Sequence, residues 1–169
     1  MDDLAAREFR EYVASRQAQL LRSAVLITGN RQDAEDLLQA ALTKLAARWP
    51  TIHHSGSPDA YVRTTMYNQR ISWWRRRRHG QEFAVGAVPE AVARGDLESD
   101  AALRLALAEV LSRLTPKQRA VVVLRYYEDL PEAEVAATLG CSVGTVRSQV
   151  HRTLARLREL CPDLMEEAV

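Results

Sequence analysis

Apolar residues recur three and four positions apart along most of this chain, and the spacing is clearest between residues 31 and 49. Side chains with that spacing share one face of an α-helix, so each such stretch predicts a helix with a buried stripe. No stretch shows the strict alternation that indicates a β-strand. The chain is therefore predicted to be all-α. The stripe in 31–49 consists of Ala34, Leu37, Leu38, Ala41, Leu42, Leu45, Ala46 and Trp49.

Three helices are predicted in the N-terminal half. The first covers residues 4–28 and stops at Gly29, a residue suited to the end of a helix. The second covers 31–49, and a loop is expected over 50–56 because that segment begins with proline. The third begins at Ser57, whose hydroxyl can cap it, and runs into a block of arginines.

Four further helices are predicted toward the C-terminus. One covers residues 103–114, and the next starts at Thr115, which precedes a proline suited to a first helical position, and reaches about Tyr127. A short helix follows and ends at Gly140. Ser142 is placed to cap the last helix, which carries an apolar face and a polar face.

The formal net charge of +1 conceals a strong local asymmetry. Residues 61–80 carry six basic side chains and no acidic one, whereas residues 81–100 carry five acidic and one basic. The acidic segment also holds glycines and a proline and lacks helical periodicity, which is typical of a flexible linker. The sequence thus predicts two small helical domains, residues 1–80 and 101–169, joined by an acidic linker over 81–100.

A helix-turn-helix is predicted in the C-terminal domain. Ala136 is small enough for two helices to cross closely, Gly140 permits a left-handed turn, and Val146 can fill the shared core. The opposite face of the last helix is polar and basic, which suits a DNA major groove better than it suits a merely solvated surface. That face consists of Thr145, Arg147, Ser148, His151, Arg152 and Arg156.

The segment over 61–80 mixes aromatic residues with arginines. Such a mixture can stack unpaired bases and hold phosphates, as binding to single-stranded or melted nucleic acid requires. Binding to a membrane surface is the competing interpretation, but it calls for a wider apolar face. Because one tryptophan of the pair Trp73 and Trp74 could simply belong to the core, one is expected to be buried and the other partly exposed.

Several other classes of protein are disfavoured. No apolar run approaches the roughly 18 to 20 residues that cross a bilayer, and no signal peptide is evident, so a cytoplasmic protein without membrane insertion is expected. The two cysteines, Cys141 and Cys161, form no CxxC motif and are expected to be free buried thiols rather than disulfide partners or ligands of a metal. No phosphate-binding loop, dinucleotide fingerprint or HExxH motif is present, so neither an enzyme, a cofactor nor a small-molecule substrate is expected.

Three stretches together resemble a known family. They are DAEDLLQAALTKLAARW, then AYVRTTMYNQRISWWRRRR, and finally LTPKQRAVVVLRYYEDLPEAEVAATLGCSVGTVRSQVHRTLARLR. In this order they are similar to the bacterial sigma-70 factors of the small extracytoplasmic-function group. The resemblance covers nearly the whole chain, and its most specific part is SVGTVRSQVHR preceded by LTPKQR.

The resemblance implies a function and site residues. It implies that the chain binds core RNA polymerase and directs initiation at a specific set of promoters, with promoter DNA as its second partner. Polymerase would be bound by Asp33, Asp36 and Gln39. The melted minus-ten element would be bound by Asn68, Arg70, Ser72, Trp73, Trp74, Arg75 and Arg76. The minus-thirty-five element would be read by Thr145, Arg147, Ser148, His151 and Arg152.

Two positions depart from the family pattern. Pro131 stands where the family usually has a capping Ser or Thr, and Gln149 stands where it usually has a basic residue. The first changes how the short helix begins, and the second removes one phosphate contact. Neither departure alters the expected function.

Two other functions stay open at this stage. A helix-turn-helix regulator that binds DNA without polymerase would need a dimerisation surface, and no further apolar stripe offers one. An interaction protein without a DNA role would not need the arginine and tryptophan segment. The exposed binding faces of a sigma factor also call for a way to hide them, either an anti-sigma protein or packing of the two domains on each other.

Overall fold

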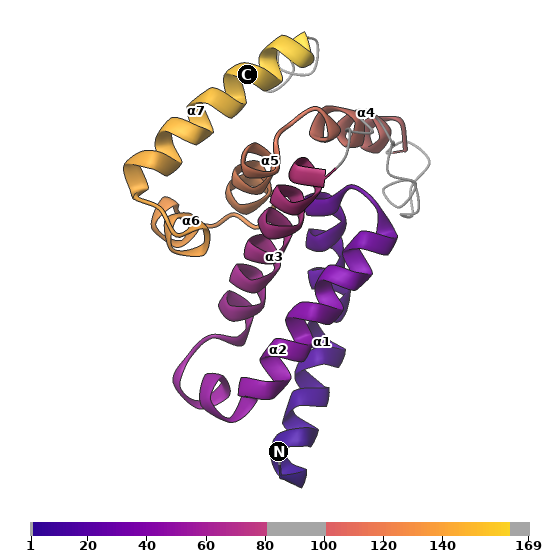
Figure 1. Ribbon diagram of the computed structural model, residues 1–169, viewed down its shortest axis with the longest axis vertical. Helices are drawn as coiled ribbons and strands as arrows, with labels where there is room; N and C mark the ends of the chain where they lie inside the picture. The colour runs from indigo at the N-terminus through magenta and orange to yellow at the C-terminus, as the bar shows by residue number, and fades with distance from the viewer. Residues whose placement is uncertain (1, 81–100, 163–169) are drawn as a thin grey trace.

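The computed structural model describes residues 2–80 and 101–162 (Figure 1). Within these two ranges every regular element is helical, so the all-α prediction is confirmed. The elements are α1 (Asp3–Thr28), α2 (Arg31–Ser55), α3 (Pro58–Gly80), α4 (Ala101–Ser112), α5 (Pro116–Val122), the π-helical turn η2 (Val123–Tyr127), α6 (Glu132–Leu139) and α7 (Val143–Leu160). The predicted linker over 81–100 lies outside the described residues.

The predicted helix ends are confirmed where capping side chains and glycines defined them. Gly29 ends α1 in the left-handed conformation, with a φ of 92°, and Gly140 ends α6 in the same way, with a φ of 65°. Ser142 Oγ accepts a hydrogen bond from the backbone of Thr145 at 3.1 Å. Thr115 forms a reciprocal capping box with Gln118 at the start of α5. These signals are local, so the sequence alone contains them.

The predicted loop over 50–56 is wrong. Helix α2 continues through Pro50 to Ser55, and the backbone N–H of Gly56 still bonds the carbonyl of Ile52 at 2.9 Å. The extra turn is held by packing at this end of α2. The buried Trp49 ring stacks on His53 one turn later, with centroids 4.6 Å apart, and meets the Phe9 ring of α1 with centroids 5.3 Å apart. Packing at this end therefore outweighs the helix-breaking tendency of proline.

The helix predicted to run from Thr115 to about Tyr127 changes from α-helical to π-helical before it ends. Helix α5 ends at Val122 and the chain continues as η2, in which the N–H of Glu128 bonds the carbonyl of Val123 at 2.9 Å. That five-residue spacing marks a π-helical turn, a feature often found at functional or strained positions. It brings Glu128 to the side of the C-terminal helices that faces α3.

Helices α1, α2 and α3 pack around an apolar core. Helix α2 contributes the stripe predicted from its spacing, with Leu37 and Leu45 fully buried, and α3 contributes Val62 and Met66. Each of these side chains has no exposed surface, which is the burial that drives helix association in water.

The C-terminal helices extend this core rather than forming one apart from it. Buried Ala120, Val123 and Leu124, together with Val135 and Val146 of the helix-turn-helix, belong to the same contiguous cluster as the α1–α3 residues. Helix α3 contacts both α5 and α6, and Figure 1 shows it between the α1–α2 pair and the α5–α6 pair. The two predicted domains are thus packed on each other in this structure.

Candidate nucleic-acid interface

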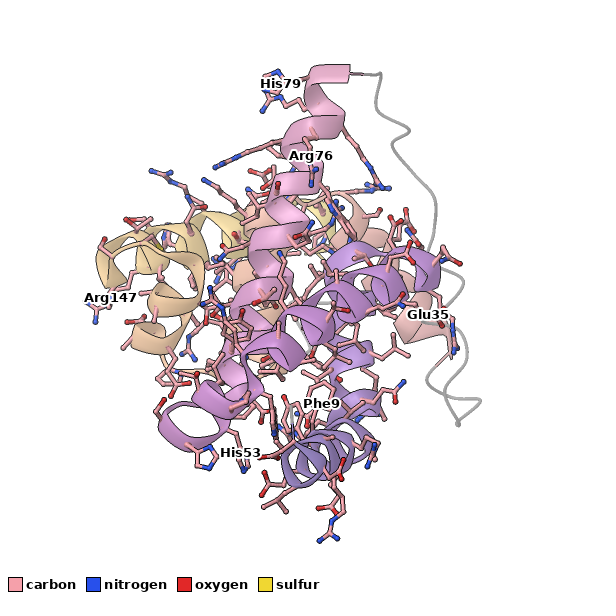
Figure 2. The ribbon with its side chains drawn as sticks, turned by 60° about the horizontal axis from the view of Figure 1, so that its bottom comes forward. Phe9, Glu35, His53, Arg76, His79 and Arg147 are labelled. Atoms are coloured by element: carbon pink, nitrogen blue, oxygen red, sulfur yellow. The ribbon has the colours of Figure 1, made fainter. Side chains whose placement is uncertain are left out.

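Helix α7 presents its predicted reading face to solvent. Val146 is fully buried against α5 and α6, which orients the polar face outward. Figure 2 shows Arg147 projecting from one edge of the molecule. All the predicted contact residues on this face are exposed: Thr145, Arg147, Ser148, His151, Arg152 and Arg156.

Three of these side chains already have partners within the helix-turn-helix, and one of them, Arg156, lies 3.2 Å from a carboxylate oxygen of Glu159 in the same helix. Arg147 Nε lies 2.7 Å from a carboxylate oxygen of Glu132 on α6, and the Thr145 hydroxyl lies 2.9 Å from that of Ser142. The Arg147 pair is largely exposed, so it contributes little to stability and is easily exchanged for another acceptor. Arg147, Ser148, His151 and Arg152 line one shallow depression on this face, which brings four predicted residues together.

The residues predicted to bind the minus-ten element, all on α3, differ in how far they are exposed to solvent. Asn68, Ser72, Arg75 and Arg76 are exposed, and Figure 2 shows Arg76 and His79 near the end of α3. Arg70 instead points into the structure. Its Nε atom is buried and has no hydrogen-bond partner. Burial lowers the pKa of Arg70, and the neighbouring positive charge of Arg77 lowers it further, while Asp33 acts in the opposite direction.

The expectation that one tryptophan of the pair is buried is wrong. Trp73 and Trp74 are both half-exposed. Consecutive residues of a helix are separated by about 100° around its axis, and each of the two rings lies partly in the core boundary and partly in solvent. Trp73 packs against the apolar core, and the guanidinium carbon of Arg78 lies 5.2 Å from the centre of the Trp74 ring.

The predicted polymerase-binding residues lie on the outer face of α2. Asp36 and Gln39 are exposed. Asp33 is half-buried: it accepts a hydrogen bond from the Asn30 amide at 2.9 Å and lies 3.5 Å from Arg77 of α3. Asp33, Asp36, Trp73, Arg76 and Arg77 line one depression. The structure therefore brings the predicted polymerase and DNA residues next to each other.

Residues that the sequence prediction omitted also belong to this region. Arg77 pairs with Asp33, and Arg78 lies over Trp74, although only the two preceding arginines of the block were chosen. Helical spacing could have found them, since Arg77 is four positions after Trp73 and Arg78 four after Trp74. Arg63 and Arg119, which connect the two halves of the structure, had no comparable local signal.

Among residues 2–80 and 101–162, no group of three His, Cys, Asp or Glu side chains is placed to hold a metal ion. No helix there is long and apolar enough to span a membrane. Cys141 and Cys161 are both free thiols, but each is half-buried rather than buried as expected.

Two family models match the chain, one for each half. The model described as "Sigma-70 region 2" matches residues 12–80, and the model described as "Sigma-70, region 4" matches residues 104–157. The first range contains the α2 and α3 residues described above, and the second contains the helix-turn-helix.

Curated relatives agree with these models. The chain is 48% identical over 152 residues to an RNA polymerase sigma-E factor of Streptomyces coelicolor, which covers 90% of this chain and 85% of the relative. It is 31% identical over 166 residues to the ECF RNA polymerase sigma factor SigE of Mycolicibacterium smegmatis, covering 94% of this chain and 63% of that one.

The fold is also found among solved structures. The sigma factor RpoE of Bartonella quintana, solved with the anti-sigma factor NepR, superposes with a TM-score of 0.72 over 93% of this chain and 98% of that chain, at 24% identity. CnrH in complex with the cytosolic domain of CnrY gives a TM-score of 0.64 at 24% identity, covering 93% and 89%. Together with the family models and relatives, this shared fold leads to one conclusion: the chain belongs to the sigma-70 family of RNA polymerase sigma factors, in its extracytoplasmic-function group.

Proposed function

We propose that this sigma factor reads its promoters through two surfaces, the outer face of α7 and the end of α3, while the polar face of α2 binds core RNA polymerase. The observation that carries this proposal is the pair of basic faces on separate helices, one suited to duplex DNA and one to unpaired bases. A DNA-binding regulator that acts without polymerase would need only the first face.

Helix α7 suits the duplex minus-thirty-five element. Its exposed arginines can donate two parallel hydrogen bonds to a guanine edge, and its hydroxyls can bond phosphates or bases. The N-terminus of this helix also favours a phosphate, because its first N–H groups point outward. Arg147 and Arg152 are the residues expected to discriminate bases.

The end of α3 suits the melted minus-ten element. Half-exposed Trp73 and Trp74 offer ring surface on which an extruded base can stack, and the exposed arginines beside them can hold the backbone. Neither role requires chemistry by the protein. We therefore infer a binding subunit without catalysis of its own, acting in the cytoplasm where core polymerase works.

Polymerase binding is assigned to Asp33, Asp36 and Gln39. Asp36 and Gln39 are exposed and can meet a partner, whereas Asp33 must exchange Arg77 for a polymerase group. That exchange costs little free energy, because the side chain of Arg77 is 63% exposed and exposed ion pairs contribute little to stability in water. Release of Arg77 would add one more cation to the DNA-binding end of α3.

An anti-sigma protein is a further expected partner. The sigma factor RpoE was solved in complex with the anti-sigma factor NepR, and CnrH was solved in complex with the cytosolic domain of CnrY. Exposed polymerase- and DNA-binding faces in this chain offer a similar target for a protein that blocks both.

Run-off transcription tests the proposal. Core polymerase from the source organism would be supplied with its fragmented genome, with and without this protein, and transcripts that need the protein should share an upstream motif. Arg147→Ala should lower their yield about 5- to 100-fold, the range for one bidentate base contact. Trp73→Ala should lower it to a similar extent through lost base stacking.

Two controls separate these effects from misfolding. Arg113→Ala removes an exposed arginine whose partner, Glu109, lies within α4, so it should leave transcription unchanged. Trp73→Phe retains an apolar ring against the core and should recover part of the activity. Polymerase-independent binding of the protein to duplex DNA, with no new transcript, would instead favour a conventional helix-turn-helix regulator.

A further inference from the structure

Helices α2 and α3 pack against each other, and two polar contacts mark the seam between them (Figure 1). Arg77 of α3 lies 3.5 Å from Asp33, near the start of α2. Farther along α2, the ammonium group of Lys44 donates a hydrogen bond to the side-chain carbonyl of Gln69 at 3.0 Å. Residues later in α2 thus meet residues earlier in α3, so the two helices are antiparallel. The second contact joins two residues to which no partner is assigned above.

Trp73 lies between these two contacts along α3. Gln69, Trp73 and Arg77 are spaced by four residues, so they share one face of the helix and follow one another about 6 Å apart along its axis. The Trp73 ring is half-exposed and lines a depression together with Asp33 and Asp36. An unpaired base stacked on this ring would therefore have one polar contact of the seam on each side.

The two ends of the seam differ in charge. One end holds the two carboxylates of α2 that line the depression, whereas residues 37–58 of the chain contain no Asp or Glu, and neither do residues 60–80. This acid-free part of α2 carries Lys44 and Arg48, which are exposed and lie one turn apart on the same face. Two cations without a neighbouring carboxylate attract a phosphate, so this end favours a nucleic-acid strand more than the other end does.

The contact with Lys44 determines which part of the Gln69 amide is available to a ligand. An ammonium group only donates hydrogen bonds, so it must bond the oxygen of the amide and leave the NH2 group to donate elsewhere. Gln69 is also half-buried, which restricts how far its side chain can turn. With its oxygen engaged, Gln69 offers a donor that matches a carbonyl oxygen or an unprotonated ring nitrogen of an unpaired base.

We propose that Lys44 holds a phosphate of the melted minus-ten strand, and that Gln69 donates a hydrogen bond to the base beside the one stacked on Trp73. The three N–H donors of Lys44 allow it to bond the phosphate and to position Gln69 at the same time. The inference rests on the proposed minus-ten role of Trp73, and it extends the DNA-binding surface from α3 onto α2.

The spacing along α3 restricts this contact to melted DNA. Gln69 and Trp73 are one turn, about 6 Å, apart along the helix. Stacked bases of a duplex are separated by about 3.4 Å along each strand. Two neighbouring bases can therefore meet both residues only when they are unstacked and splayed apart.

The salt dependence of promoter binding tests the phosphate contact. Core polymerase carrying this protein would be titrated, at several salt concentrations, with a labelled promoter from run-off transcription whose minus-ten element is kept unpaired by mismatches. The slope of log affinity against log salt concentration should become shallower by about 0.7 for Lys44→Ala, the value for one phosphate of a single strand. Lys44→Arg should keep the wild-type slope. The matched control is Arg113→Ala, which removes an exposed cation paired within α4 and should leave the slope unchanged.

Binding selection from a randomised promoter tests the role of Gln69. The same complexes would select from promoters whose unpaired positions are randomised, and the bound sequences would be counted. The wild type should prefer one base about two- to tenfold at the position beside the one affected by Trp73→Ala, the range for one hydrogen bond. Gln69→Ala and Lys44→Met should both lose this preference at the same position, whereas Lys44→Arg should retain it.

Each result supports or overturns a stated part of the proposal, provided that the melting curves of the variants match that of the wild type. An unchanged salt slope for Lys44→Ala would overturn the phosphate contact. A preference that is lost in Gln69→Ala but kept in Lys44→Met would overturn the positioning of Gln69, and a wild type without any preference there would overturn the base contact. Weaker binding of Lys44→Ala to core polymerase without DNA would overturn the DNA assignment in favour of a polymerase contact. Failure of the proposed function would be recognised separately, as absence of promoter-specific transcripts from the wild type.

Discussion

Tyr67 shows how the interface between the two halves imposes a cost on a single residue. Its side chain is 1% exposed, yet its hydroxyl has no hydrogen-bond partner. Burial raises the pKa of Tyr67 well above its usual value, and the charge of Glu128 raises it further, against a smaller opposing effect of Arg63. A buried hydroxyl without a partner costs free energy relative to water.

Replacing Tyr67 by phenylalanine should therefore stabilise the protein. Tyr67→Phe removes the unsatisfied hydroxyl and retains the ring, so the free energy of unfolding in urea should rise by about 1 kcal/mol. In the wild type the unfolded state ionises this tyrosine above pH 10 while the folded state does not, so stability should fall as the pH rises past 10. The variant should show a shallower fall. Loss of more than about 1 kcal/mol at pH 7 would mean that the hydroxyl has a partner in solution.

At the scale of elements, contacts between neighbouring residues determine where most helices begin and end, whereas contacts between distant residues determine where α2 ends. The caps at Ser142 and Thr115 and the turn at Gly140 depend on neighbours within a few residues, so the sequence predicted them. The continuation of α2 past Pro50 depends on Trp49 meeting Phe9, 40 positions away. Tertiary packing of this kind cannot be found from spacing along one helix.

In the candidate site, too, the features that depend on helical spacing were predicted, and those that depend on tertiary packing were not. The exposed face of α7 follows from its helical period and was predicted residue by residue, while its DNA contacts stay a prediction. The burial of the Arg70 Nε atom was not foreseen, because it depends on how the helices pack around α3. The half-exposure of both tryptophans likewise depends on where the core boundary crosses α3.

The two left-handed glycines offer a matched test of element packing. Gly140→Ala adds a methyl group in open space and should cost about 1–2 kcal/mol, the strain of a left-handed residue. Gly29→Ala bears the same strain, but its methyl group would also lie 3.2 Å from the Arg119 guanidinium. Urea unfolding should show a larger loss for Gly29→Ala. Equal losses would indicate that Arg119 moves away at no cost.

At the scale of the whole molecule, a single apolar cluster joins the two matched family regions. Helix α3 is central to this arrangement, because one of its faces completes the α1–α2 core and another meets α5 and α6. The same helix carries the proposed minus-ten surface. Packing of the two halves and the proposed recognition of melted DNA therefore involve the same helix.

Site-specific photo-cross-linking in the complete promoter complex tests the central claim most directly. A photoreactive residue would replace exposed Ser148 on α7 or exposed Ser72 on α3, and the complex would be assembled with core polymerase on a promoter identified by run-off transcription. The account predicts that position 148 cross-links duplex DNA about 25 base pairs upstream of the unpaired strand cross-linked from position 72. Cross-links from both positions within about 12 base pairs, the span of about 40 Å that a compact chain of this length covers, would contradict it.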